Sequence, residues 1–588
     1  MTLSKQGQSG SALILVMIMS GVALAILAGV MLWSSQSSRL THRTIQYTRS
    51  VAAAEAATEK VVSQISRDFL YGGENLVMLN LSSYRQNTVP TTGDSSYWGN
   101  WTFSDGNGNV GQTYVQQTGA NQYVVLGSTY AGLKGYVTTF TIVSHASDKA
   151  SPQDVPGGVY QELQLTGIPI FQFAMYSMGD MEISCGQPFV VTGPVHANNE
   201  LFIEPDNSLT FLSGVTAVVD VVNGRNPLDT RGPPAGLPAN YALADASPSQ
   251  PQAPFQYLNL PIGTPGTTNS PEMIREIIEP PPAGEDPTSA LGRLRYYNEC
   301  DMIVTVSDNA VTATSGMFNN KVTVITNTDV ALFISTNSNF YDPREGKTVM
   351  PVDIDVGSLK TWSETNATLR LALGLTAPAN LQSSIYVVDN RNITGSFLPA
   401  VRVTHGAVLG TNGLTVATGQ PLYVWKDFNQ YNSANLGTSN TLTTRPASLV
   451  ADAITILSDN WTDENSRSDV SARTATPTTV NAAILTGVVE TTAGHYSGGM
   501  ENFPRFLETW GATIFTYNGS MVKMFPSKYA TGVWGQGNVY VPPKRNWAYD
   551  SNFNDPTKLP PKTPSLLVVQ RNRWSTVAPD TNGATAFR

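Results

Sequence analysis

The stretch from Ser11 to Trp33 reads SALILVMIMSGVALAILAGVMLW and carries no charge over 23 residues. A helix needs about 20 residues to cross the hydrocarbon core of a bilayer, so this stretch is long enough to span it. A cleaved secretory signal has a shorter apolar region of about 7 to 15 residues, followed by a small-residue cleavage site. Here Arg39 and Arg43 follow the stretch instead. We therefore predict a transmembrane helix whose ends lie at Ser11 and Trp33.

The segment after this stretch, from Ser34 to Leu70, contains no Gly or Pro. Its apolar residues recur at loosely helical spacing, and the pair Gly72-Gly73 supplies a stop signal. At 1.5 Å per residue, a helix over 11–70 would form a rod of about 90 Å. The sequence therefore predicts one helix, apolar in its first half and amphipathic in its second, although a simple membrane anchor has no need of the second half.

Three features of this region together form a pattern. They are a short polar leader ending in Gly10, an apolar run that begins SALILVMI, and the Ala-rich stretch AAAEAA at 52–57. Over residues 1–65 this pattern resembles the N-terminal region of PilX-type minor pilins. The resemblance implies that a prepilin peptidase cuts between Gly10 and Ser11 and leaves Ser11 as the mature N-terminus. It also implies that other pilin-like subunits bind through the helix.

The chain departs from the pilin pattern in two respects. Major pilins carry a Glu at the fifth mature position, which is Leu15 here. Subunits that lack this Glu, such as the K-type pseudopilin of type II secretion, sit at or near the filament tip, so the resemblance implies a tip or initiating role. Second, Arg39, Arg43 and Arg49 follow the span while only Lys5 and the α-amine precede it, which by charge alone favours the opposite orientation.

Composition narrows the class of the remaining chain. Among 588 residues only 13% are charged, while Gly (49) and Pro (37) are frequent, which favours strands and turns over soluble helices. The net charge of -9 supplies no basic surplus for a phosphate backbone, so we expect no nucleic-acid partner. The two cysteines, Cys185 and Cys300, are read either as one disulfide or as two buried thiols.

We predict a mainly β fold behind the long helix. Alternating apolar and polar segments over 71–166 indicate an antiparallel β unit, which would form a pilin-like α+β unit with the helix. Short β-branched strands separated by Gly and Asn over 167–575 favour a β-solenoid similar to a parallel β-helix. A β-sandwich is the alternative, because no strict repeat period is visible.

Three further segments complete the predicted organisation. Residues 1–10 form the leader and 576–588 a tail. The interval 223–287 is rich in Pro and Ala and is predicted to be an extended excursion or flexible loop, with a short helix near Pro271 to Ile278.

A search for catalytic or metal-binding motifs finds no recognisable site. No histidine has another His or a Cys at metal-ligand spacing, which makes a zinc site improbable; the five are His42, His145, His196, His405 and His495. His196 could face a groove beside Asn198 and Glu200, but a turn histidine bonded to backbone groups is the preferred interpretation. The acids Asp180, Glu182, Asp452 and Asp459 cannot be placed on one face from sequence and are read as solvated turn residues.

The stretch SDGNGNVGQT at 104–113 matches a glycine pattern of dinucleotide sites through Gly106, Gly108 and Gly111. A strand follows the glycines where such a site needs a helix, so a hairpin turn is preferred. Asp105 opens a sequence similar to a calcium loop that lacks the closing Glu. We expect no cofactor, no metal and no enzyme.

The tryptophans offer one remaining signal, because exposed aromatic rings stack on sugars or anchor interfaces. Most are expected in the core, but Trp510, Trp534, Trp547 and Trp574 concentrate near the C-terminus. The leading hypothesis is a minor-pilin-like or pseudopilin-like structural subunit of a type IV pilus or type II secretion filament. It would be a single-pass protein of the bacterial inner membrane, with its large region in the periplasm or on a surface filament. An envelope-anchored adhesin that binds surface glycans or proteins is the alternative, and a β-helix polysaccharide lyase or hydrolase the third hypothesis.

Overall fold

The computed structural model describes residues 11–127, 130–151, 155–232, 235–242, 250–262, 270–317, 320–366, 383–430, 432–535 and 537–578. The predicted leader 1–10, including Gly10, and residues 579–588 of the predicted tail lie outside this set. The protein is mainly β, with one long N-terminal helix, α1 (Ser11–Leu79), as the sequence predicted. The helix runs past the predicted end at Leu70, and Gly73 (φ 67°) introduces a kink without ending it. A short helix, α2 (Leu81–Gln86), follows.

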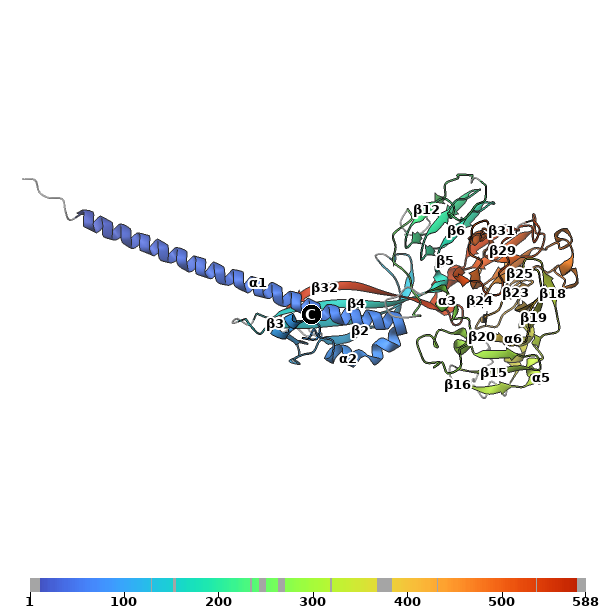
Figure 1. Cartoon of the computed structure of the whole chain (residues 1–588), viewed down its shortest axis with the longest axis horizontal. Coiled ribbons are helices and arrows are strands. Elements are labelled where there is room, and N and C mark those ends of the chain that lie inside the picture. The colour runs from blue at the N-terminus through green and yellow to red at the C-terminus, as the bar shows by residue number, and fades with distance from the viewer. Residues whose placement is uncertain are drawn as a thin grey trace, which may run out of the picture.

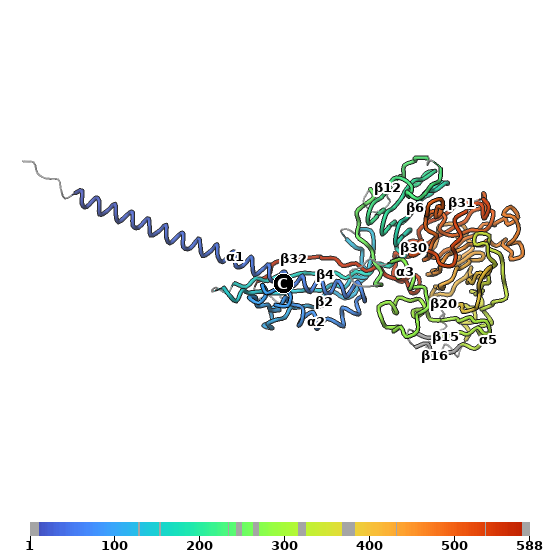
Figure 2. The backbone as a smooth tube through the Cα atoms, in the orientation of Figure 1, coloured from blue at the N-terminus to red at the C-terminus, as the bar shows by residue number. Residues whose placement is uncertain are grey.

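A mixed-length antiparallel sheet packs against the second half of α1. It runs in the order β1-β3-β4-β32, with β2 paired to β3; its strands are β1 (Trp101–Ser104), β2 (Tyr114–Val125), β3 (Lys134–Asp148), β4 (Gly157–Pro169) and β32 (Ser565–Val577). We call α1, α2 and this sheet the first unit. In Figures 1 and 2, β32 (red) runs beside β4 (cyan), although the two strands are far apart in the sequence.

The place of β32 corrects the predicted division of the chain. The sequence placed the end of the first unit near Thr166 and assigned 167–575 to one continuous region. Ser565 pairs with Pro169 and Val577 with Gly158, so this strand belongs to the first unit. A region of stacked parallel strands, which we call the solenoid, is therefore inserted as residues 170–564 between two neighbouring strands of one sheet. A linear reading missed this because sheet pairing is not limited by sequence separation.

The first coils of the inserted region stack in parallel with a strict repeat. Met175 pairs with Val195, and Val195 pairs with Val215, a spacing of 20 residues each time. The same spacing joins the other strands, so the expectation that no strict period exists is wrong over 175–223. The strands are β5 (Met175–Ser177), β6 (Met181–Ile183), β7 (Phe189–Val191), β8 (Val195–Ala197), β9 (Leu201–Ile203), β10 (Leu209–Phe211), β11 (Val215–Ala217) and β12 (Val221–Asn223).

Later coils extend the same stack from its other side. One wall, which we call the first wall, runs in the order β11-β8-β5-β30-β27-β24-β22-β20-β14 with parallel pairing throughout, and the hairpin β15-β16 closes it. Its later strands are β14 (Met302–Val306), β15 (Val311–Met317), β16 (Asn320–Ile325), β20 (Ser384–Asp389), β22 (Leu414–Thr418), β24 (Ala447–Ala451), β27 (Ala483–Val488) and β30 (Met521–Pro526).

Two further walls lie beside the first, and some coils have no strand on the third wall. The second wall holds the stacks β6-β9-β12 and β19-β21-β23-β25-β28, and the third wall holds β7-β10-β13 and β26-β29-β31. This parallel stacking of successive chain turns is the pairing of a β-solenoid and differs from that of a sandwich. The remaining strands are β13 (Asn240–Tyr241), β17 (Ile334–Ser335), β18 (Phe340–Asp342), β19 (Lys347–Asp355), β21 (Phe397–Thr404), β23 (Leu422–Trp425), β25 (Ile454–Leu457), β26 (Thr478–Asn481), β28 (Arg505–Phe506), β29 (Ile514–Gly519) and β31 (Lys544–Tyr549).

The chain enters this stack in the middle. It winds from β5 out to β12, crosses the outside of the stack to β14 at the far end, and winds back until β30 pairs with β5. The register aligns Met521 with Met175, both of them in the apolar interior. Two separate segments thus form one continuous hydrophobic core.

The Pro-rich excursion predicted over 223–287 is not a flexible loop in the parts that the structure describes. Leu258, Leu260, Ile274 and Ile278 are fully buried against the outer face of the first wall. The predicted short helix is confirmed as α3 (Pro271–Arg275), capped by Ser270. The excursion acts as a cover, because a parallel sheet with an apolar outer face needs a second layer. Other helices are α4 (Tyr296–Glu299), α5 (Asn327–Val330) and α6 (Val356–Thr365).

Candidate functional site

The first half of α1 is the largest exposed apolar surface of the described chain. Every residue from 11 to 45 is exposed, including Leu15 at 62% and Trp33 at 71%. Within the described residues, α1 is the one helix long and apolar enough to cross a membrane. In Figure 1 this half projects away from the rest of the molecule. Such a surface requires lipid or another apolar partner.

The second half of α1 lies on the antiparallel sheet. Ala53, Ala54 and Ala57 are buried and bring the helix close to β4, where a Cβ added at Gly157 would lie 2.6 Å from the backbone nitrogen of Val51. Further along, the buried apolar residues of the helix contact those of β3 and β4; they are Val61, Val62, Ile65 and Phe69. The predicted amphipathic half is therefore the face that holds the sheet.

Polar contacts fix the helix at two more places. Both guanidinium amines of Arg571 on β32 donate to the carboxylate of Glu59 at 2.7 Å. Beyond the sheet, the buried carboxylate of Asp68 accepts hydrogen bonds from Tyr84 at 2.7 Å and from Asn80 at 2.9 Å. Burial and this bond to Asp68 raise the pKa of Tyr84 well above its usual range. The second half of the helix is thus held to the sheet and to the segment around α2.

The arginines that follow the predicted span lie on the exposed part of the helix. Arg49 pairs with Asp148 at 3.7 Å, at the edge of the sheet. Arg39 and Arg43 form no ion pair with a residue that the structure describes, and they remain available for a membrane surface or another subunit.

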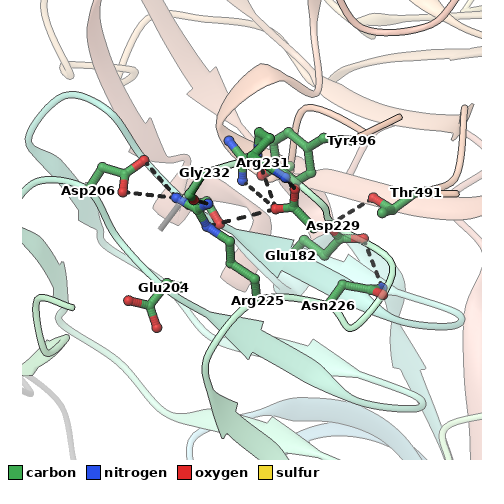
Figure 3. Close-up of polar contacts among 12 residues, drawn as sticks. Glu182, Glu204, Asp206, Arg225, Asn226, Asp229, Arg231, Gly232, Thr491 and Tyr496 are labelled. Carbon is green, nitrogen blue, oxygen red and sulfur yellow. Dashed lines mark hydrogen bonds and ion pairs between the residues drawn. The ribbon is translucent and has the colours of Figure 1, made fainter. Parts of the chain in front are cut away.

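A polar cluster lies between the first coils and the loop after β27 (Figure 3). Glu182 on β6 accepts from Thr491 at 2.9 Å and from Asn226 at 3.3 Å. Arg231 donates to Asp229 at 2.7 Å and its guanidinium lies 3.5 Å from the centre of the Tyr496 ring.

Burial disfavours the charged form of both acids of this cluster, but the pKa values of Glu182 and Asp229 shift in opposite directions. Burial raises the pKa of Glu182, although the Thr491 bond and the charge of Lys523 oppose it. Burial also disfavours the charge on Asp229, but the hydrogen bonds and charge of Arg231 outweigh it and lower the pKa of that carboxyl. Arg225 completes the cluster by donating to Asp206 at 3.2 Å. Sequence reasoning missed the cluster, because Glu182 and Thr491 are 309 residues apart.

The other acids named in the sequence analysis, Asp180, Asp452 and Asp459, do not lie together in one site. Asp452 is fully buried and pairs with Arg275 at 2.6 Å. Its carboxylate also accepts hydrogen bonds from the backbone N–H groups of residues 528–530. Asp452 is therefore a structural residue, and the prediction that it is a solvated turn residue is wrong. Asp459 pairs with Lys426 at the surface. Asp180 accepts from Asn199 in an exposed turn. Within the described ranges, no three His, Cys, Asp or Glu side chains lie where they could hold a metal ion.

His196 is fully buried and does not face an open groove. Its ring nitrogens contact Thr216 at 2.8 Å and Asn198 at 2.9 Å, so its partners are side chains and not the backbone groups that the sequence suggested. Burial lowers its pKa to about 4, which keeps the ring neutral at physiological pH. The ring stacks on Tyr176 as part of the core.

The glycine-rich stretch after β1 is a hairpin turn, as preferred from the sequence. Ser104 and Val110 form an antiparallel bridge. The Asp105 carboxylate accepts from the backbone N–H of Asn107 at 2.8 Å and from the side chain of Asn109 at 2.8 Å. Burial opposes the charge on Asp105, but these hydrogen bonds outweigh it and lower its pKa. The carboxylate therefore stabilises the turn itself.

No disulfide joins Cys185 and Cys300, and both thiols are buried. Burial raises the pKa of the Cys185 thiol to about 12. Of the four C-terminal tryptophans, Trp510 and Trp547 are in the core, Trp534 is half-buried, and Trp574 is 50% exposed on β32. Only a minority of these rings is therefore available to a partner.

These features define a mainly β protein with one long, half-exposed N-terminal helix. The sequence matches no model of a known protein family and no curated protein. Among solved structures, the chain is similar to the competence-associated pilin ComZ from Thermus thermophilus, at 10% identity and a TM-score of 0.26, over 90% of this chain and 97% of that chain. A likeness at this level supports no inference about the present protein.

Proposed function

We propose that this protein is a minor-pilin-like structural subunit of a type IV pilus or a type II secretion filament. One observation carries the proposal: a single helix continues from an entirely exposed apolar half into a half that packs rigidly on an antiparallel sheet. The exposed half suits lipid before assembly and the helices of other subunits after it. The PilX-type leader and Ala-rich stretch of the sequence support the same assignment.

The tip of the filament is the position we propose within such an assembly. The solenoid lies beyond the end of the first unit that is remote from the exposed helix, so it prolongs the molecule along its long axis (Figure 1). In a filament whose subunits stack along their helices, this volume would overlap the next subunit in that direction. Leu15, which stands where major pilins carry a Glu, suits a subunit with no neighbour beyond it.

Processing by a prepilin peptidase between Gly10 and Ser11 is part of the proposal. The experiment is mass spectrometry of the mature N-terminus in cells that contain the peptidase, with Gly10→Leu as the variant. We expect the natural chain to begin at Ser11 and the variant to remain uncut. A natural chain that begins at Met1, or beyond Trp33, contradicts the assignment.

The proposed location is the inner membrane, crossed by residues from Ser11 to Trp33, with the solenoid in the periplasm. A large region with few charges suits export, although Arg39, Arg43 and Arg49 favour the opposite orientation. Protease added to spheroplasts should degrade the solenoid. A C-terminal reporter that is active only in the cytoplasm would overturn this orientation.

We propose further that the inserted solenoid is a structural or binding module and not a catalyst. The acids Asp180, Asp452 and Asp459 are each engaged in separate contacts, which supports a non-catalytic role. An adhesin that binds glycans or proteins is the second candidate, and a lyase or hydrolase the third. Incubation of the full chain with bacterial and host polysaccharides separates them, because retention without released ends indicates binding and turnover indicates catalysis.

A further inference from the structure

The part of α1 between the predicted span and the sheet carries positive charge alone. Residues 11–54 contain no Asp or Glu, and the first acid of the helix is Glu55. Three arginines fall in this interval, Arg39, Arg43 and Arg49. Since the whole chain has a net charge of -9, this positive charge is a local feature, opposite in sign to the rest of the molecule.

Arg39 and Arg43 lie on the face of the helix that packs on the sheet further along. Arg39 is 18 residues before Ala57, and Arg43 is 18 residues before Val61, which is five turns at 3.6 residues per turn. Ala57 and Val61 are fully buried, and the helix has no kink before Gly73. The two arginines are therefore on the sheet side of α1, in the interval between the end of the span and the beginning of the sheet.

This interval is long enough to contain the headgroup layer of a bilayer. The first buried residue of the helix is Ser50, 17 residues after Trp33, which corresponds to about 25 Å. The polar layer on each side of the hydrocarbon core is about 5–8 Å thick. With the span ending at Trp33, Arg39 lies about 9 Å beyond the core and Arg43 about 15 Å. The side chain of Arg39 can reach lipid phosphates, and Arg43 lies within about one Debye length of them.

The chain itself supplies no anion for these two arginines in the part that the structure describes. Both side chains are exposed and form no ion pair with a described residue. Arg49, the next arginine along the helix, pairs with Asp148 at the edge of the sheet instead. A guanidinium group matches phosphate oxygens in a two-point geometry, so an anionic headgroup suits the two unpaired cations.

We propose that Arg39 and Arg43 bind the phosphate groups of anionic phospholipids on the sheet side of α1. This inference rests on the proposed membrane span, because the span sets the depth of both arginines. Lipid is favoured over the acidic surface of another subunit, since the headgroup layer lies within reach of Arg39 before any filament is assembled. The bound lipids would hold the first unit at the membrane surface.

Fluorescence quenching of the full chain, reconstituted into vesicles, tests the proposal because Trp33 marks the end of the span. The vesicles contain phosphatidylcholine and phosphatidylglycerol, and the acyl chains of one or the other lipid are brominated. The other tryptophans lie in the first unit and the solenoid, so bromine in the membrane should quench Trp33 alone. Trp33→Phe checks this assignment. We expect phosphatidylglycerol to be enriched around Trp33 by at least about fivefold, the contribution of one basic residue near an anionic surface.

The double variant Arg39→Gln, Arg43→Gln should lose most of this enrichment, and replacement of both arginines by Lys should retain it. Added salt should weaken the enrichment in the natural chain. The matched control is Arg67→Gln, an exposed arginine on the packed half of the same helix, which should leave the enrichment unchanged.

Three results would overturn the proposal. These are equal quenching by the two lipids, unchanged enrichment in the double variant, and an equal loss in Arg67→Gln. A double variant that keeps its lipid preference but no longer enters a filament would assign the arginines to another subunit and overturn the lipid assignment. Absence of quenching by either lipid would contradict the span itself, whereas equal quenching by both contradicts the lipid preference and leaves the span in place.

Discussion

The two halves of α1 have the same backbone structure and opposite surroundings. From Ser11 to Ile45 every side chain is exposed, and from Ser50 to Val77 one face is buried on the sheet of the first unit. Apart from the kink at Gly73 both halves are α-helical, so the difference lies in what covers the side chains. The first half needs a partner outside the chain, and the second half finds its partner inside it.

The partner of the second half comes from distant parts of the chain. The sheet includes β32, which is separated from β4 by the whole inserted solenoid. Leu567 of β32 belongs to the same buried cluster as Val61 and Ile65 of the helix. The packed half therefore depends on the chain returning correctly from the solenoid, and the exposed half does not. Four predictions test this contrast.

Removal of β32 should have the largest effect. A chain that ends at Pro564 loses the buried Leu566, Leu567 and Val568, which we expect to destabilise the first unit by more than about 5 kcal/mol. Hydrogen exchange in detergent should show lost protection in β3 and β4 while the exposed half of α1 stays helical. A chain ending at Ala578 retains β32 and is the control. Unchanged protection in the shorter chain contradicts the dependence.

Matched substitutions on the helix should separate its halves. Ile65 is fully buried, so Ile65→Ala should lower the free energy of unfolding of the first unit by about 2–5 kcal/mol. Ile26, at 62% exposure, is the control, and Ile26→Ala should change it by less than about 0.5 kcal/mol. Chemical denaturation in detergent measures both variants. Equal losses would show that the two halves do not differ as described.

A charge in the exposed half should impair membrane insertion. Leu24 lies near the middle of the predicted span, and Leu24→Arg should cost about 2.5–3.5 kcal/mol of insertion free energy. Membrane fractionation should show a larger soluble or degraded fraction. Ser37→Arg, placed beyond the span on the same helix, should leave insertion unchanged. Normal membrane recovery of Leu24→Arg would mean that this half does not enter lipid.

The ion pair between Arg571 and Glu59 should have the smallest effect. Both side chains are partly exposed, at 61% and 34%, so solvent screening limits the pair. Arg571→Gln should lower the stability of the first unit by about 0.2–1 kcal/mol, with a smaller difference at high salt. Denaturation at two salt concentrations measures this, and a loss above about 2 kcal/mol would show a structural role beyond surface charge.

The 20-residue repeat of the solenoid is a feature that could not be predicted from the sequence. The 20-residue spacing from Met175 through Val195 to Val215 is present in the sequence, but each strand has only three residues, and the first coil has Met175 where the next two have Val. Short strands buried on both faces give little alternation to read. The predicted mainly β class is therefore confirmed, while the period of the stacked parallel strands was not recognised in the sequence.

The candidate sites were less accessible to a linear reading. The polar cluster joins Glu182 to Thr491, which are 309 residues apart in the chain. Neither of these residues has a motif at fixed spacing. Only the stacking of coils from two chain segments brings them together.

The sequence by itself determined the N-terminal helix, its apolar first half and the β character of the chain beyond the helix, because hydrophobic length and periodicity are local properties. Tertiary structure alone decided that β32 closes the first unit and that β30 joins β5. Strand pairing depends on which edges remain available after the rest of the chain has folded. That information is distributed over the whole chain, so no single stretch contains it.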